Sequence, residues 1–367
     1  MPPVSVLILA PAPAPAAGPL ASLLDEARVA LGEHHRRGFL AAGAADAAVR
    51  REPPDDTPFG ARLRRVSAET MPVGPRGLVV LGAASIPLAT LGDRRALVEA
   101  AAEDVPGALA NQRYSADALA IARADLVLPM LPTDLDSDNA LPRWLAERGR
   151  LPVHDLRTRR RLAMDLDSPL DLLLLDGAAA LGRTRLPMPT PADAARVRDV
   201  LDRLRALAAD PGAELLLAGR LSSADLRWAE RHTRSRTRAL VEERGLRTAT
   251  AGALVGRPNR RPPRAVLGEL LERDGVGSLG RLVAGLADGA LLDSRVLLAH
   301  RGGADERAWP SPEDRYASDL LLADRVRDPW LAELTAAAAA APIPILLGGH
   351  ALVGPGSRLA LAHGGAS

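Results

Sequence analysis

The sequence predicts an α/β protein with two domains, and three observations support this class. Short apolar runs alternate with longer segments of helical periodicity, which is typical of a largely parallel sheet with helices on both faces. The chain has 367 residues, enough for two domains of ordinary size. Its residues are 47% hydrophobic and 25% charged, which is the composition of a globular protein.

Four apolar runs in the first half predict buried strands: VSVLILA (4–10), GLVVLGA (77–83), DALAIA (117–122) and LPVHDL (151–156). Segments of helical periodicity separate them and predict helices over 18–43, 92–103 and 139–149. The proline-rich stretch RTRLPMPTPADAARV (183–197) then predicts a domain boundary. We therefore expect a first three-layer domain with a mostly parallel sheet over 1–183, and a second α/β domain over 184–367.

The second half repeats the alternation. Its apolar runs predict strands over 213–219, 289–300 and 343–349. Its periodic segments predict helices over 193–210, from 222 onward, and over 265–274 and 328–341. The final stretch, LVGPGSRLAL (352–361), predicts a closing hairpin that turns at Gly354-Pro355-Gly356.

Composition excludes several classes of function. The chain has no cysteine, so disulfides, zinc–thiolate sites and thiol catalysis are excluded. The net charge is only +2 and aromatic residues make up 2%, so no basic stripe with stacking aromatics indicates a nucleic-acid partner. The apolar runs are too short to span a bilayer, and the first of them has no basic flank typical of a signal peptide. We expect a cytoplasmic protein without a membrane partner, and a homo-oligomer stays open.

The stretch RRLAMDLDSPLDLLLL (160–175) is the most informative segment. It predicts Asp165 and Asp167 at the end of a buried strand, directly before a helix. One interpretation is a helix start, with Ser168 as N-cap, Pro169 at the first helical position and Asp171 in the first turn. The other is a cation site beside a nucleotide, because hard cations prefer carboxylate oxygens.

Three stretches of the first half resemble GT-A-like nucleotidyltransferases, in particular the small guanylyltransferases of the phospholactate and molybdenum-cofactor type. They are LVVLGAASIPLATLGDRRALVEAA (78–101), ALANQRYSADALAIA (108–122) and the segment 151–175, in the family's order and spacing over about residues 4–176. The resemblance implies a GT-A fold. It also implies binding of a nucleotide or a phosphorylated metabolite, and metal-dependent nucleotidyl transfer to a small phosphorylated acceptor.

In that family two acidic motifs hold Mg²⁺, which neutralises the phosphates during transfer. The resemblance assigns Asp165 and Asp167 to the second motif, as catalytic residues and metal ligands. Ser85 stands where the first motif has an aspartate, and we expect Ser85 and Asp165 to lie at neighbouring strand ends.

The chain departs from the family at the loop after its first strand. There PAPAPAAGPLASLL (11–24) has one glycine and neither lysine nor arginine, and proline has no amide donor for a phosphate. This loop and Ser85 favour an alternative function. The protein would then be a catalytically degenerate relative that serves as a binding, regulatory or scaffolding protein.

Two further groups of polar residues are candidate ligand sites. The segment NQRYSAD predicts a substrate-binding group in the first domain, formed by Asn111, Arg113, Tyr114, Ser115 and Asp117. Polar residues near predicted strand ends or in loops predict a second-domain site, formed by Asp293, Arg295, His300, Arg315 and His350. Arginines of this second group would bind a phosphate or carboxylate.

Overall fold

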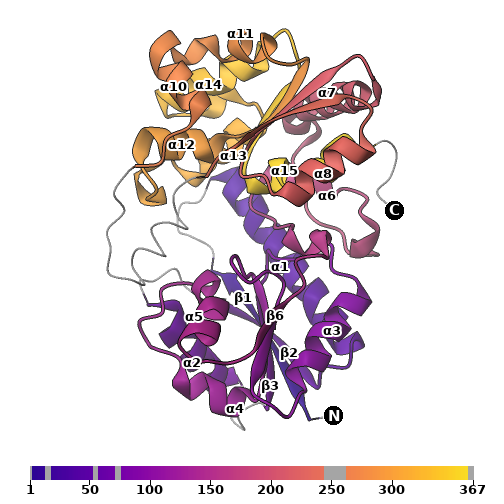
Figure 1. The fold of residues 1–367 in the computed structure, drawn as a ribbon, viewed down its shortest axis with the longest axis vertical. Coiled ribbons are helices and arrows are strands. Elements are labelled where there is room, and N and C mark those ends of the chain that lie inside the picture. Colours follow the sequence, from indigo (N-terminus) through magenta and orange to yellow (C-terminus); the bar gives the residue numbers. More distant parts are fainter. Residues whose placement is uncertain (1, 13–17, 53–56, 71–75, 244–261, 363–367) are drawn as a thin grey trace. The chain divides into compact units, whose positions relative to one another are not determined.

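The structure is a computed structural model that describes residues 2–12, 18–52, 57–70, 76–243 and 262–362 (Figure 1). Helices with one mixed and one parallel sheet confirm the predicted α/β class. The chain divides into two compact units: a first unit of Met1–Ala16, Asp25–Leu166 and Ala179–Leu186, and a second unit of Ala17–Leu24, Asp167–Ala178 and Pro187–Ser367. Short segments of the first half of the chain belong to the second unit, and the chain returns to the first unit at Ala179–Leu186. A single boundary between residues 183 and 184 therefore stays a prediction.

The first unit contains a six-stranded sheet in the order β2-β1-β3-β5-β4-β6. Strand β5 runs antiparallel to both of its neighbours, and the other pairings are parallel. The strands are β1 (Val4–Pro11), β2 (Asp46–Glu52), β3 (Gly77–Gly82), β4 (Gly107–Ala110), β5 (Ala118–Ala122) and β6 (Val153–Asp155). The parallel strands β1 and β3 lie side by side, so their carboxyl ends meet at one edge of the sheet.

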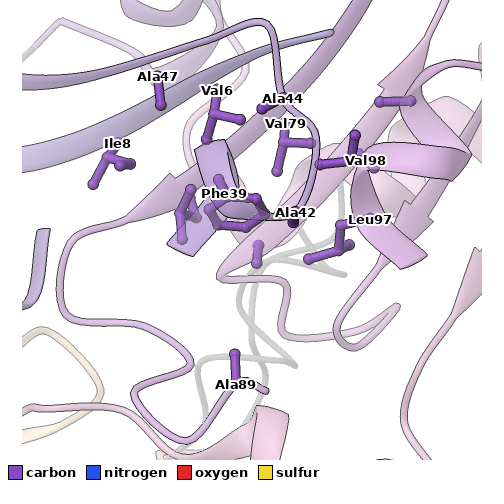
Figure 2. Close-up of a cluster of buried hydrophobic side chains, with 14 of the residues drawn as sticks. Val6, Ile8, Phe39, Ala42, Ala44, Ala47, Val79, Ala89, Leu97 and Val98 are labelled. Carbon is purple, nitrogen blue, oxygen red and sulfur yellow. The ribbon is translucent and has the colours of Figure 1, made fainter. Parts of the chain in front are cut away.

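Side chains that alternate along the central strands form two apolar cores in the first unit. Val6 and Val79 contribute to one core, whereas Leu7 and Leu78 contribute to the other, as the period of two in a strand requires. The first core includes side chains of α1 (Pro19–Ala41) and α3 (Leu91–Ala101). Figure 2 shows this core, in which Phe39 of α1 is fully buried.

The second core packs on other helices of the first unit. Leu63 of α2 (Phe59–Thr70) and Leu145 of α5 (Leu141–Glu147) both belong to it, as does Val127 of the short α4 (Ala124–Val127). A sheet with a separate apolar core on each face corresponds to the expected three layers.

The second unit contains a four-stranded, fully parallel sheet in the order β10-β9-β7-β8. Its strands are β7 (Glu214–Gly219), β8 (Arg236–Val241), β9 (Gly289–Asp293) and β10 (Ile345–Gly348). Its helices are α6 (Pro169–Leu175), α7 (Pro191–Ala209), α8 (Ser223–His232), α10 (Val266–Asp274), α11 (Leu279–Ala284), α12 (Ser294–Gly302), α13 (Pro312–Asp319), α14 (Pro329–Ala339), α15 (His350–Val353) and α16 (Ser357–Leu361). None of the helices described in either unit is long and apolar enough to cross a membrane.

Three predicted elements of the chain are wrong. The strand predicted over 289–300 ends at Asp293, whose side chain accepts a hydrogen bond from the Arg295 N–H and so caps α12. The predicted closing hairpin is a pair of short helices, α15 and α16, because Gly354-Pro355-Gly356 separates two helical segments. Asp165 and Asp167 do not end a strand, since a 3₁₀-helix (Arg160–Ala163) precedes them and Asp165 forms only an isolated β-bridge.

Candidate functional site

A cavity of about 420 Å³ lies at the carboxyl ends of β1 and β3 in the first unit. Its walls are mostly apolar, with Leu9 and Leu81 from these strands, Leu119 from β5, Phe59 from α2 and Leu141 from α5. This volume falls within the range of small-molecule sites, and the carboxyl edge of an α/β sheet is where ligands usually bind. We therefore take this cavity as the candidate site of the first unit.

Four charged residues also line the cavity: Glu52, Arg62, Asp117 and Asp138. Glu52 forms an ion pair with Arg65, and the Arg62 guanidinium donates to the Thr57 carbonyl at 3.1 Å. Carboxylates therefore outnumber arginines around the cavity. This charge balance favours a ligand that offers hydrogen-bond donors, or one whose own negative charge is neutralised by a cation.

Ser85 and Asp165 face each other across an isolated antiparallel β-bridge, which confirms the expected proximity of these two residues. The Ser85 hydroxyl is buried and lies 2.7 Å from the Gly82 carbonyl oxygen and 3.1 Å from that of Asp117. Gly82 and Asp117 both line the cavity. The bridge is thus attached to the wall of the cavity, with the Ser85 hydroxyl donating to the backbone there.

A buried histidine that the sequence did not single out holds the Ser85 segment. His35 of α1 lies with its Nε2 atom 2.8 Å from the Ser85 carbonyl oxygen, so Nε2–H donates this hydrogen bond. Burial, and then the positive charge of Arg94, lower the pKa of His35 to about 3, so the ring is neutral near pH 7. In the next residue, Ile86 has a φ of 44°, a strained value for a β-branched residue.

Asp93 anchors the helix that follows this segment. Burial alone would raise its pKa, but hydrogen bonds from Arg161, Thr90 and Arg159 outweigh that effect and lower the pKa to about 2. The carboxylate lies 2.6 Å from Arg161 Nη2 and 2.9 Å from Arg159 Nη1. It therefore links α3 to the segment that leads to Asp165.

The residues predicted in the segment 111–117 mostly shape the loop rather than the cavity. Asn111 is buried, donates to the Leu162 carbonyl at 2.9 Å, and accepts from the backbone N–H groups of Asp117 and Ala118. Arg113 and Ser115 are half-buried, Tyr114 is 57% exposed, and none of the three lines the cavity. Asp117 is the one residue of this predicted group that does.

The second aspartate of the predicted metal pair belongs to the second unit. There the backbone N–H groups of Asp167 and Ser168 donate to the Asp171 carboxylate at 2.9 and 2.8 Å. Ser168 is the N-cap of α6 and Pro169 its first residue, so the helix-start interpretation is confirmed. The described residues contain no group of three or more His, Asp or Glu side chains suited to a metal ion. Metal ligation by Asp165 and Asp167 stays a prediction.

The proline-rich loop after the first strand, which departs from the family pattern, lies partly outside the described residues, which omit 13–17. The first turn of α1 is described within the second unit, where the N–H groups of Leu20 and Ala21 donate to the Glu313 carboxylate at 3.1 and 2.9 Å. A Cβ atom built on Gly18 would overlap the end of the Glu313 side chain, so a side chain at this position would displace that carboxylate. These two amide donors are therefore occupied by a carboxylate.

The predicted second-domain residues do not form one group. His300 lies within α12, where its Nδ1 atom accepts from the Ala265 N–H at 3.0 Å and Nε2 lies 3.0 Å from Glu272. Arg315 pairs with Glu306. Asp293 and His350, in contrast, lie at the carboxyl ends of the neighbouring strands β9 and β10, and both contact Arg220, which the prediction did not include.

Comparison with models of known protein families found no match for this chain, and comparison with curated proteins found none. Fold and geometry therefore define its class: an α/β protein whose first unit has a cavity at the carboxyl edge of its sheet.

Proposed function

We propose that the first unit is a GT-A-like domain that binds a nucleotide, with the base in the cavity at the carboxyl ends of β1 and β3. The cavity is the observation that carries this proposal, because its apolar walls suit a flat ring and its position is that of ligand sites in α/β sheets. The mostly parallel sheet of this unit, with an apolar core on each face, is consistent with the same assignment.

The carboxylates of the cavity favour guanine over adenine. A carboxylate only accepts hydrogen bonds, and guanine offers a ring N–H and an amino group side by side. Glu52, Asp117 and Asp138 supply such acceptors around the cavity.

A resident metal ion does not fit the donors at the bridge. The Ser85 hydroxyl donates to backbone carbonyls, and Asp165 alone supplies a carboxylate at the bridge itself. Mg²⁺ held by one carboxylate depends on phosphates for its other ligands. Binding is thus the leading function. Nucleotidyl transfer to a small phosphorylated acceptor is the second candidate, favoured by the proximity of Asp165 to Ser85.

Filling the cavity tests the proposal. A Cβ atom built on Gly82 meets only the Ser85 hydroxyl, at 3.9 Å, so the backbone accepts a Cβ atom there and Gly82→Val places two methyl groups at the cavity wall. We expect this variant to bind GTP in the presence of Mg²⁺ at least about tenfold more weakly than the wild type in isothermal titration calorimetry. The wild type should bind GTP more tightly than ATP.

The matched control is Gly92→Ala, which adds a methyl group in the first turn of α3, away from the residues that line the cavity. It should bind GTP like the wild type. Unchanged GTP binding by a folded Gly82→Val variant would contradict the proposal, as would a wild type that binds neither nucleotide.

A further inference from the structure

A second group of polar residues lies at the carboxyl edge of the parallel sheet in the second unit. In the order β10-β9-β7-β8, the chain moves from β7 outward to β8, and from β9 outward to β10 in the opposite direction. The pair β7 and β9 is therefore the point at which the direction of connection reverses. In open parallel sheets, ligands bind at this position, outside the carboxyl ends of the two strands.

Arg220 directly follows β7, Asp293 is the last residue of β9, and the two side chains pair with each other. Asp293 is 2% exposed and accepts from Arg220 Nε at 2.6 Å and from Nη2 at 3.1 Å. Gly219 has a φ of 130°, and a side chain there would collide with Asp293, so glycine permits this close approach. The pairing orients the Arg220 guanidinium and occupies its Nε and Nη2 donors. Nη1 has no hydrogen-bond partner among the described residues, and the side chain is 20% exposed.

His350, which follows β10 after Gly349, has a fixed tautomer. Its Nδ1 atom lies 2.9 Å from the Arg220 carbonyl oxygen, which can only accept, so Nδ1 carries the proton. Burial, and then the charge of Arg220, lower the pKa of His350, which favours the neutral ring. Nε2 is then a hydrogen-bond acceptor. It has no partner within the described part of the chain, and the residue is half-buried rather than enclosed.

We propose that Arg220 and His350 form a binding site for a small oxyanion that also carries a hydroxyl group. Arg220 Nη1 donates to an anionic oxygen of a phosphate or carboxylate, and His350 Nε2 accepts from the hydroxyl. Because Asp293 already balances the charge of Arg220, binding depends on these hydrogen bonds more than on net charge. The site lies in the second unit and does not depend on nucleotide binding by the first.

Phosphate and sulfate test the hydroxyl requirement, because phosphate keeps a proton near neutral pH and sulfate does not. We expect the full-length protein to bind inorganic phosphate in the millimolar range, and at least about tenfold more tightly than sulfate, in NMR titrations. Phosphate should also shift the Nε2 resonance of His350 in ¹⁵N-labelled histidine spectra, whereas sulfate should not. Glycolate and acetate form the corresponding pair for carboxylates, and glycolate should bind more tightly.

The informative variant is His350→Asn, whose amide can still donate to the Arg220 carbonyl but has no acceptor at the Nε2 position. It should lose the preference for phosphate over sulfate. His232→Asn is the control, because His232 makes the same type of Nδ1 bond, at 2.9 Å to the Trp228 carbonyl, on the surface of the same unit. Equal affinity for phosphate and sulfate in the wild type would overturn the proposal. So would no binding of either anion, or a preference that persists in His350→Asn.

Discussion

Replacing Asp319 with alanine should lower the free energy of unfolding by about 3–5 kcal/mol, because Arg295 would remain buried without its partner. The two side chains form a bidentate pair, with Arg295 Nη1 and Nη2 at 2.5 and 2.7 Å from the carboxylate oxygens. Asp319 is 0% exposed and Arg295 is 8% exposed. Urea unfolding monitored by circular dichroism measures the effect. The urea concentration at the midpoint should fall, whereas the dependence of the unfolding free energy on urea concentration should stay the same.

Two further variants distinguish the contribution of this buried ion pair to stability from that of an exposed ion pair. Asp202→Ala removes the carboxylate that pairs with Arg205 on α7, where Asp202 is 76% exposed, and should cost less than about 1 kcal/mol. The double variant Arg295→Met/Asp319→Leu should recover most of the lost stability, because apolar side chains can replace a buried ion pair. A loss below about 1 kcal/mol for Asp319→Ala would show that water reaches Arg295.

The wild-type protein should lose stability as the pH rises from about 5 to 8, and Asp171→Asn should remove this loss. Burial, and then the negative charges of Asp167 and Asp319, raise the pKa of Asp171 to about 8. The folded state therefore holds a proton that the unfolded chain releases near pH 4. Stability from this proton is present below pH 4 and decreases as the pH rises toward 8, by about 2–4 kcal/mol between pH 5 and 8.

Asparagine is the matched replacement at position 171. Its carbonyl oxygen can accept the hydrogen bonds from the Asp167 and Ser168 N–H groups, and its amide stays neutral at every pH. Urea midpoints of both proteins at pH 5 and 8 give the difference. Other groups with shifted pKa values, such as His35, cancel in this comparison. Parallel pH profiles of the two proteins would contradict the buried, protonated Asp171.

The sequence predicts those elements whose burial is uniform. Strands β1, β3 and β5 are apolar runs because both faces of each strand are covered. By contrast, β2 and β8 lie at sheet edges, carry arginines such as Arg50 and Arg238, and have no apolar run to detect. The sequence predicts a strand over the apolar stretch after Asp293, because a fully buried helix and a buried strand have the same composition.

The candidate site was predictable only where its residues are close to a recognisable motif. The order of the segments predicted that Ser85 and Asp165 are neighbours, and the bridge between them agrees. Phe59, Arg62 and Glu52 were not predicted as a group, because they come from separate elements that meet only in the folded unit. Arg220 does not belong to the predicted second-domain site, because nothing in the sequence indicates its pairing with Asp293.

Nucleotide binding at the carboxyl edge of the first sheet is the central claim, and a crystal structure of the full-length protein grown with GTP and Mg²⁺ tests it most directly. The account predicts electron density for the base inside the cavity, in contact with Phe59 and Leu119, with the ring N–H and amino group facing a carboxylate of the wall. Density for the nucleotide outside this cavity, or an empty cavity at a saturating GTP concentration, would contradict it.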